Sequence, residues 1–504
     1  MNAEVLADFV PLEKAGGASN LFTDSQTIHV LIYTDDPITV TETSSFGVAL
    51  LRKFIDAHQP AFAKIEIELV SRNTNFFDEN SHAKNQLTDT RLGGVDQVWF
   101  FGIHRANLAQ FTPQSVIDSN RGGPKSELLP EEVASLKAWM KTGGVLVSGD
   151  HAENTPPNTS DTNLPSTLVL GRALGSKIPR AHQLHIWEGG PTTDPNNSYD
   201  TQEPDGTTDL NNLDLQRDSK PQKLILARFE GGRPHPLFIA ADGSEIDVFP
   251  DHAHEGEAGI PDSFDSDWEG TPKPVIVAYG TDKRKPAIYT MVIAYDGDTD
   301  GVGRIVSHST WHHFLNTNLS GFDSDPTSTT KGSVADRIGQ YYSNLAVWLA
   351  PLSKRQAMSQ SMFWWLANHP LLMEEASSDP LRIGTVARTL LRKAATPFEI
   401  QELLLAHTPP GIRAQRDSIY FPAEGNALAA LPSQELLLGS VISRYYQSRA
   451  TVAEAAAIVT EGISTNGSAA PKVIRSGLAD GFSARARMLA EAQAAAAAHL
   501  VHFY

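Results

Sequence analysis

The sequence of 504 residues contains no cysteine. This absence excludes disulfide bonds, thiolate metal ligands and a cysteine nucleophile. Long apolar runs are missing too, since no stretch approaches the roughly 20 apolar residues that a membrane-spanning helix needs. The first residues, MNAEVLADFVPLEK, lack the basic start and the apolar segment of a signal peptide. We therefore expect a cytoplasmic protein that does not bind membranes.

Basic residues are scarce relative to acidic ones. There are 41 Lys and Arg residues against 59 Asp and Glu residues, a formal net charge of −18. An acidic surface repels phosphate backbones, so nucleic acid is not an expected partner. An excess of acidic residues is typical of a well-solvated protein surface, and it is also compatible with cation binding.

Strand and helix patterns alternate through the first 150 residues. Apolar runs at residues 27–34, 64–70, 95–103 and 145–147 predict buried strands. Helical spacing is found at residues 44–58 and again from Pro130, where Glu131 and Glu132 favour a helix start. This alternation predicts an α/β fold with a doubly wound, mostly parallel sheet and helices on both faces.

The later part of the chain divides into further segments. Residues 164–174 and 332–350 have helical spacing, and strands are predicted at 224–229, 237–240, 245–249, 275–279, 287–294 and 303–307. The last two are expected to form an added antiparallel β hairpin. We predict an N-terminal arm (1–26), an α/β domain (27–350) with a polar insertion (191–220), and a helical C-terminal region (351–504). The last region is rich in Ala and Leu and is a candidate for contact with a protein partner or for self-association.

Polar residues follow several of the predicted strands. In an open α/β sheet, ligands bind outside the carboxyl ends of the strands. The strand at 145–147 is followed by Ser148, Asp150 and His151. Two other strands are followed by the candidate substrate-binding residues Asp35, His104 and Arg105. Taken singly, each is better explained as a polar residue that enters a solvent-exposed loop.

The densest polar motif is Asp251-His252-Ala253-His254-Glu255. On an extended chain, imidazoles at positions i and i+2 point the same way. Imidazole and carboxylate are the ligands of zinc, iron or manganese when no thiolate is present. Glu255 could then act as the base on a metal-bound water. The alternative is an exposed polar loop.

A second histidine motif follows the last predicted strand. His312 and His313 are adjacent, so only one of them can face a given site from a regular element. Trp311 and Phe314 indicate partial burial, and a buried histidine hydrogen-bonded to the backbone is the alternative. Together with the first motif, we predict a shared site with metal ligands His151, His252, His254, His312 and His313. Its catalytic carboxylates would be Glu255 and Asp150.

Two other motifs are weaker. Asp296, Asp298, Asp300 and Gly301 match the front half of a calcium loop, but Ser307 stands where that loop needs a glutamate. Asp-Gly between two strands favours an ordinary hairpin turn, with calcium binding as the alternative. Ser148 is a candidate catalytic nucleophile, although Leu146 and Asp150 replace both glycines of the Gly-x-Ser-x-Gly motif.

The chain resembles the trehalose-utilisation (ThuA-like) family of the class I glutamine amidotransferase-like superfamily. The similarity lies in the segments 129–151 and 303–313 and in the step His235-Pro236, and it extends over residues 27–350. It implies a flavodoxin-like fold, a role for His151 and for His312 or His313, and a context in sugar metabolism. Because the amidotransferase cysteine is absent, the resemblance does not imply amidotransferase activity.

Three functions remain open at this point. The first is a metal-dependent hydrolase or lyase that acts on a small, carbohydrate-type substrate at the carboxyl edge of the sheet. The second is a non-catalytic binding or scaffold protein with a degenerate amidotransferase-like fold. The third is a metal-free serine hydrolase that uses Ser148.

Overall fold

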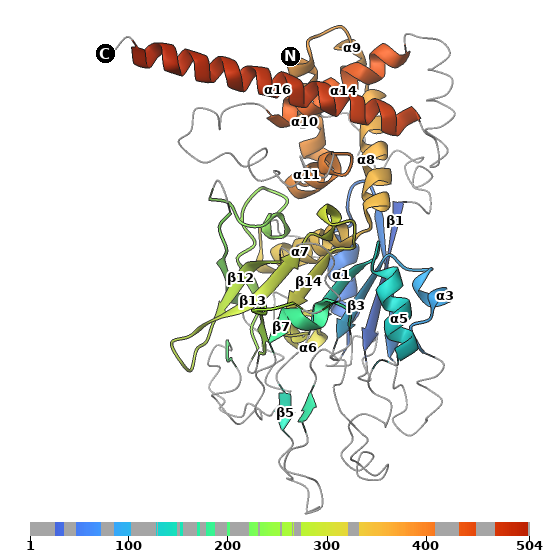
Figure 1. Cartoon of the computed structure of the whole chain (residues 1–504), viewed down its shortest axis with the longest axis vertical. Helices are drawn as coiled ribbons and strands as arrows, with labels where there is room; N and C mark the ends of the chain where they lie inside the picture. Colours follow the sequence, from blue (N-terminus) through green and yellow to red (C-terminus); the bar gives the residue numbers. More distant parts are fainter. Residues whose placement is uncertain are drawn as a thin grey trace, which may run out of the picture.

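The computed structural model describes a large part of the chain (Figure 1). The described residues are 26–34, 47–71, 85–101, 128, 130–148, 152–154, 169–171, 178–186, 199–201, 221–229, 232–252, 255–264, 266, 274–320, 332–408, 433–449 and 469–501. The polar insertion expected at 191–220 lies outside these residues, except for 199–201.

An eight-stranded sheet forms the centre of the molecule (Figure 1). In sheet order the strands are β2 (Lys64–Ser71), β1 (Thr27–Thr34), β3 (Gln97–Phe101), β4 (Gly144–Ser148), β14 (Ile305–His308), β13 (Ile288–Tyr295), β12 (Val275–Thr281) and β9 (Ile225–Leu226). The first five strands are parallel to one another. The pairs β14–β13, β13–β12 and β12–β9 are antiparallel. The predicted α/β class with a mostly parallel sheet is confirmed.

Each face of the sheet carries its own layer of apolar side chains. Alternate residues of a strand point to opposite faces, so neighbouring residues of one strand belong to different layers. Ile32, Leu146 and Val306 belong to one buried cluster, whereas Leu31, Val147 and Ile305 belong to the other. These strands are buried on both sides, which explains their continuous apolar sequences.

Helices cover both faces. On the face of Leu146, α1 (Ala49–Ala57) packs against α7 (Val334–Leu349). On the opposite face, α5 (Pro130–Trp139) buries Leu136, and α3 (Asp89–Leu92) lies beside it. The predicted helix start at Pro130 is confirmed.

Short elements connect the main strands. Three two-stranded sheets are formed by β5 (Ala152–Asn154) with β6 (Val169–Gly171), β7 (His185–Ile186) with β11 (Glu257–Ala258), and β8 (Pro221–Lys223) with β10 (Val248–Pro250). Single turns of helix are η5 (Ala181–Leu184), η7 (Pro236–Phe238), η8 (Gly297–Thr299), η9 (His312–Phe314) and α6 (Asn316–Leu319).

Two sequence-based predictions are wrong in this part of the chain. The helix expected at 164–174 contains β6 instead, whose residues Val169–Gly171 pair with β5. The strand expected at 237–240 begins as η7, because Pro236 at the first helical position favours a helical turn. His235 caps this turn by accepting a hydrogen bond from the Leu237 amide.

The regular elements described in the C-terminal region are all helices. They are α8 (Leu352–Ala367), α9 (Pro370–Glu374), α10 (Pro380–Ala394), α11 (Pro397–Leu405), α14 (Ser433–Arg449) and α16 (Ala469–Val501). Helix α14 packs against both α10 and α16, and α16 crosses the end of the molecule farthest from β5 (Figure 1). No helix in the described segments is long and apolar enough to cross a membrane.

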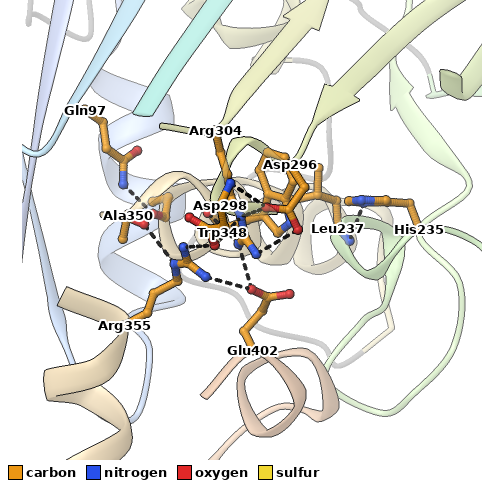
Figure 2. A network of polar contacts seen from close by, with 11 residues as sticks. Gln97, His235, Leu237, Asp296, Asp298, Arg304, Trp348, Ala350, Arg355 and Glu402 are labelled. Atoms are coloured by element: carbon orange, nitrogen blue, oxygen red, sulfur yellow. Dashed lines mark hydrogen bonds and ion pairs between the residues drawn. The ribbon is translucent and has the colours of Figure 1, made fainter. Parts of the chain in front are cut away.

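The helical region contacts the amino edge of the parallel strands. Lys354 of α8 donates a hydrogen bond to the carbonyl of Thr27, the first residue of β1, and pairs with Asp96 just before β3. Arg304, just before β14, contacts Glu402 of α11 (Figure 2). One apolar cluster is shared by both regions, since it includes Leu146 of β4 and Leu403 of α11. The helices are thus joined to the sheet at the edge opposite to its carboxyl ends.

Candidate functional site

The site lies where β14 and β4 end. In the parallel pair β4–β14, His308 is in register with Ser148, so both stand at the carboxyl edge. The chain continues from His308 through Ser309 into η9, which contains His312 and His313. All four of these residues are buried. The second histidine motif therefore follows the strand into the interior.

Glu255 approaches the same place from the loop between β10 and β11. Its backbone pairs with that of Tyr199 in an isolated β-bridge, which holds the residue in an extended conformation. Its carboxylate is completely buried and accepts three hydrogen bonds from neutral groups: Thr201 Oγ1 at 2.8 Å, Gln222 Nε2 at 2.7 Å and Ser309 Oγ at 2.9 Å. The carboxylate thus joins four separate segments of the chain.

His313 is the imidazole partner of Glu255. The distance from His313 Nε2 to Glu255 Oε1 is 3.3 Å, and both side chains are at most 1% exposed. Burial alone would raise the pKa of Glu255, but the positive charge and hydrogen bond of His313 lower it to about 2, with a smaller contribution from Tyr289. Burial, followed by the charge of Glu255, raises the pKa of Tyr289 well above its usual value. Glu255 is therefore a stable carboxylate at neutral pH.

The other ring nitrogen of His313 has different surroundings. Within the described residues, His313 Nδ1 makes no hydrogen bond, although it is buried. The ring packs against Phe249 with centroids 5.3 Å apart, and the Tyr342 hydroxyl donates to the His313 carbonyl. The imidazole is therefore fixed by its neighbours, and its Nε2 lies near both the Glu255 carboxylate and the amide nitrogen of Gln222, 3.1 Å away.

His252 and His312 form a stacked pair. Their ring centroids are 3.9 Å apart and their planes differ by 18°. The nitrogen lone pairs of an imidazole lie in the plane of its ring. In two stacked, nearly parallel rings these lone pairs do not converge on one position, so stacking does not favour binding of one metal ion by both rings. The backbone amide of His252 donates to Thr201 Oγ1, which connects this pair with the surroundings of Glu255.

His308 has a tyrosine partner. Its Nε2 lies 2.6 Å from the hydroxyl of Tyr341 in α7. Burial, together with the charge of His313, lowers the pKa of His308 well below its usual value, so the ring is neutral. Burial also raises the pKa of Tyr341, which keeps its hydroxyl protonated.

Five of the predicted site residues lie in the described part of the chain, and the structure brings four of them together. Glu255 contacts His313, and His252 stacks on His312. Ser148 is in register with His308, a residue that was not predicted as functional. The other predicted residues lie outside the described residues: Asp35, His104, Arg105, Asp150, His151 and His254.

The prediction of a metal site stays a prediction. Within the described residues, no three His, Asp or Glu side chains are grouped so that they could hold a metal ion. The proposed calcium ligands have other contacts. Asp296 and Asp298 pair with Arg304, and Asp298 also pairs with Arg355, while Asp300 accepts a hydrogen bond of 2.7 Å from the Tyr295 hydroxyl.

Sequence reasoning missed three partners of Glu255, namely Thr201, Gln222 and Ser309. Thr201 stands beside the polar insertion, and Gln222 lies in a short strand with no recognisable motif. Only Ser309, which precedes Trp311 in the second histidine motif, carried a signal. Its position after a buried strand could have suggested a functional role.

Comparison with known proteins gives little further information. No protein-family model and no curated protein matches the chain. A solved structure described as "mmIFT52 N-terminal domain" aligns with a TM-score of 0.32 and 11% sequence identity, over 63% of this chain and 96% of that one. A TM-score this low does not establish a common fold, so the function has to be argued from the site.

Proposed function

We propose that the chain is an enzyme of the hydrolase or lyase type, with His313 as its acid–base group. The observation that carries the proposal is the buried pair Glu255–His313 at the carboxyl edge of the sheet. A carboxylate that binds one imidazole nitrogen fixes the tautomer and the orientation of the ring and stabilises its protonated form. The second nitrogen, Nδ1, can then exchange a proton with a substrate.

The role of Glu255 in this proposal differs from the expected one. A general base needs a pKa near the working pH. The pKa of Glu255 is lowered to about 2 by its buried surroundings and His313, and its oxygens accept several hydrogen bonds. Such a carboxylate is a weak base. We assign Glu255 as the residue that positions His313, and His313 as the group that transfers protons.

The same pair is compatible with the metal-dependent form of the proposal. Histidines that bind metal ions commonly donate their other ring N–H to a carboxylate. Glu255 would serve as that carboxylate, and His313 Nδ1 would bind zinc, iron or manganese. The remaining ligands would come from Asp150, His151 and His254, because His252 and His312 are stacked on each other.

The strand order supports the location of the site. In the parallel part of the sheet the strand order is β2-β1-β3-β4-β14, which is compatible with the proposed flavodoxin-like arrangement 2-1-3-4-5. Ligands of such sheets bind at the carboxyl ends of the strands. This agrees with the resemblance to the ThuA-like family, from which we take a small, carbohydrate-type substrate as the first class to test.

The test is a screen of the full chain against chromogenic esters and glycosides, together with elemental analysis. We expect the wild type to turn over at least one of these substrates. The variant His313→Asn should turn it over at least about a hundredfold more slowly, since general acid–base catalysis contributes roughly 10²–10⁴-fold to the rate. His29→Asn is the control, because His29 lies partly exposed on β1. Metal that is lost in His313→Asn would establish the metal-dependent form. Equal turnover of both variants would refute the assignment of His313.

A second function, non-catalytic binding, is favoured by one specific observation. Glu255, His252, His312 and His313 are all at most 1% exposed. Buried polar networks also serve to fix a unique core. On this reading, His313→Asn lowers the stability of the fold while the full chain turns over none of the substrates, and the function resides in its surface.

A further inference from the structure

Ser148 and His308 form a pair of neighbouring side chains beside the proposed acid–base group. They are in register on the parallel strands β4 and β14, and both are completely buried. Paired residues of adjacent strands point to the same face and lie about 5 Å apart. The face is that of Leu146 and Val306, where Phe249 and Phe314 pack against the ring of His308.

Tyr341 determines which nitrogen of His308 carries the proton. In the described residues, its hydroxyl makes one hydrogen bond, of 2.6 Å, to His308 Nε2. A buried hydroxyl needs an acceptor, and a neutral imidazole has one nitrogen that accepts and one that donates. If Tyr341 donates to Nε2, the ring proton is on Nδ1. The raised pKa of Tyr341 and the lowered pKa of His308, both caused mainly by burial, are consistent with two neutral groups.

The pair therefore presents two hydrogen-bond donors. Within the described residues, neither His308 Nδ1 nor Ser148 Oγ has a hydrogen-bond partner. An unsatisfied buried polar group costs about 1–3 kcal/mol. Two neutral donors held side by side in a water-excluded place suit an oxygen that carries or develops negative charge. Once Nδ1 is protonated, His308 offers no acceptor to a cation, and the hydroxyl oxygen of Ser148 is the one acceptor left on this pair.

We infer that Ser148 and His308 bind a carbonyl or carboxylate oxygen of the substrate, with Tyr341 as the residue that positions His308. This inference rests on the proposed function and narrows its substrate class to carbonyl compounds, such as esters, amides or oxo acids. The rings of His308 and His313 have centroids 6.0 Å apart. The inference places the oxygen of a small carbonyl compound on His308 and an exchangeable proton of that compound near His313.

The first test reads the tautomer of His308 directly. Long-range proton–nitrogen NMR spectra of the full chain with ¹⁵N-labelled histidine distinguish the two tautomers, and His308→Gln assigns the signals. We expect the Nδ1–H form in the wild type and a shift toward Nε2–H in Tyr341→Phe. Tyr295→Phe is the control, because its hydroxyl contacts Asp300 at the opposite edge of the sheet. An Nε2–H form in the wild type, or no change in Tyr341→Phe, overturns the inference.

The second test uses acetate and acetamide as probes. We expect both to shift the His308 Nδ1 resonance of the wild type. In Ser148→Ala the affinity should fall about tenfold, the equivalent of one hydrogen bond worth about 1.4 kcal/mol. No shift with either probe, or equal affinity in Ser148→Ala, overturns the inference. If His313→Asn still binds acetate and acetamide and also keeps full turnover, the proposed function is refuted. The inference that Ser148 and His308 bind an oxygen would remain supported.

Discussion

Arg304 donates a hydrogen bond of 2.7 Å from Nη1 to Oε2 of Glu402, which lies 98 residues further along the chain. Both side chains are at most 1% exposed. The guanidinium also contacts Asp296, Asp298 and the ring of Trp348, with 4.6 Å from Arg304 Cζ to the ring centroid (Figure 2). Arg304 therefore connects three parts of the chain. These are the loop between β13 and β14, the end of α7 and the helix α11.

This cation should control the stability of the junction between the sheet and the helical region. The variant Arg304→Met keeps most of the side-chain volume but removes the charge that Asp296, Asp298 and Glu402 share, while Arg355 still lies near Asp298 and Glu402. Removing one partner of a buried ion pair costs about 3–5 kcal/mol, because a charge is left uncompensated. Urea unfolding should show a loss of this size.

The control for this prediction is Arg228→Met. Arg228 pairs with Glu245, and both side chains are substantially exposed. Exposed pairs contribute at most about 1 kcal/mol. Equal losses of unfolding free energy in Arg304→Met and Arg228→Met would contradict the role of Arg304 in the stability of the junction.

Close contact between α10 and α14 depends on glycine. A Cβ atom added at Gly384 would collide with the backbone of Glu435, and one added at Gly439 would collide with the backbone of Pro380. Gly384→Ala should therefore separate the helices and lower the free energy of unfolding by at least about 2 kcal/mol, as overpacking does.

The matched variant on the same helix is Thr385→Ala. Thr385 is exposed, and its hydroxyl donates to the Leu381 carbonyl in the preceding turn. Its replacement should change stability by no more than about 0.5 kcal/mol. Thermal unfolding of both variants provides the comparison, and a neutral Gly384→Ala would mean that the two helices do not pack as closely as described.

The central strands could be predicted because their signals are local. Strand β1 spans Thr27–Thr34, the full length of its apolar run, and α5 begins at Pro130. Both elements are determined by the periodicity of apolar residues and by the residue preferences at the ends of helices and strands. These signals act over a few residues. The short strand β9 and the turn η7 depend on partners distant in sequence, and there the predicted boundaries differ from the observed ones.

The site could be predicted in its residues but not in its contacts. Glu255 and His313 were both selected from their sequence surroundings, yet nothing in the sequence showed that they pair. Their meeting depends on the antiparallel bridge at Tyr199 and on the course of the chain after β14. The role of Gln222 was invisible, because a single glutamine in a short strand has no distinctive pattern.

The pair Glu255–His313 should make stability depend on pH in the acid range. Burial raises the pKa of Glu255, but His313, with smaller contributions from Tyr289 and His252, lowers it from an ordinary value of 4.5 to about 2 in the folded chain. A carboxylate with a lowered folded-state pKa stabilises the fold above its unfolded pKa, and this contribution is lost as the pH falls through the folded pKa. The contribution is about 3 kcal/mol at neutral pH.

The measurement is the free energy of unfolding of the wild type and of Glu255→Gln from pH 6 to pH 2. Gln keeps the shape of the side chain but does not ionise, so the advantage of the wild type should shrink by about 3 kcal/mol between pH 4.5 and pH 2. Glu66→Gln, at an exposed pair with Lys64, should show little change over this range. A constant difference between wild type and Glu255→Gln would mean that Glu255 is not ionised when paired with His313, and the assignment of His313 as the acid–base group would lose its support.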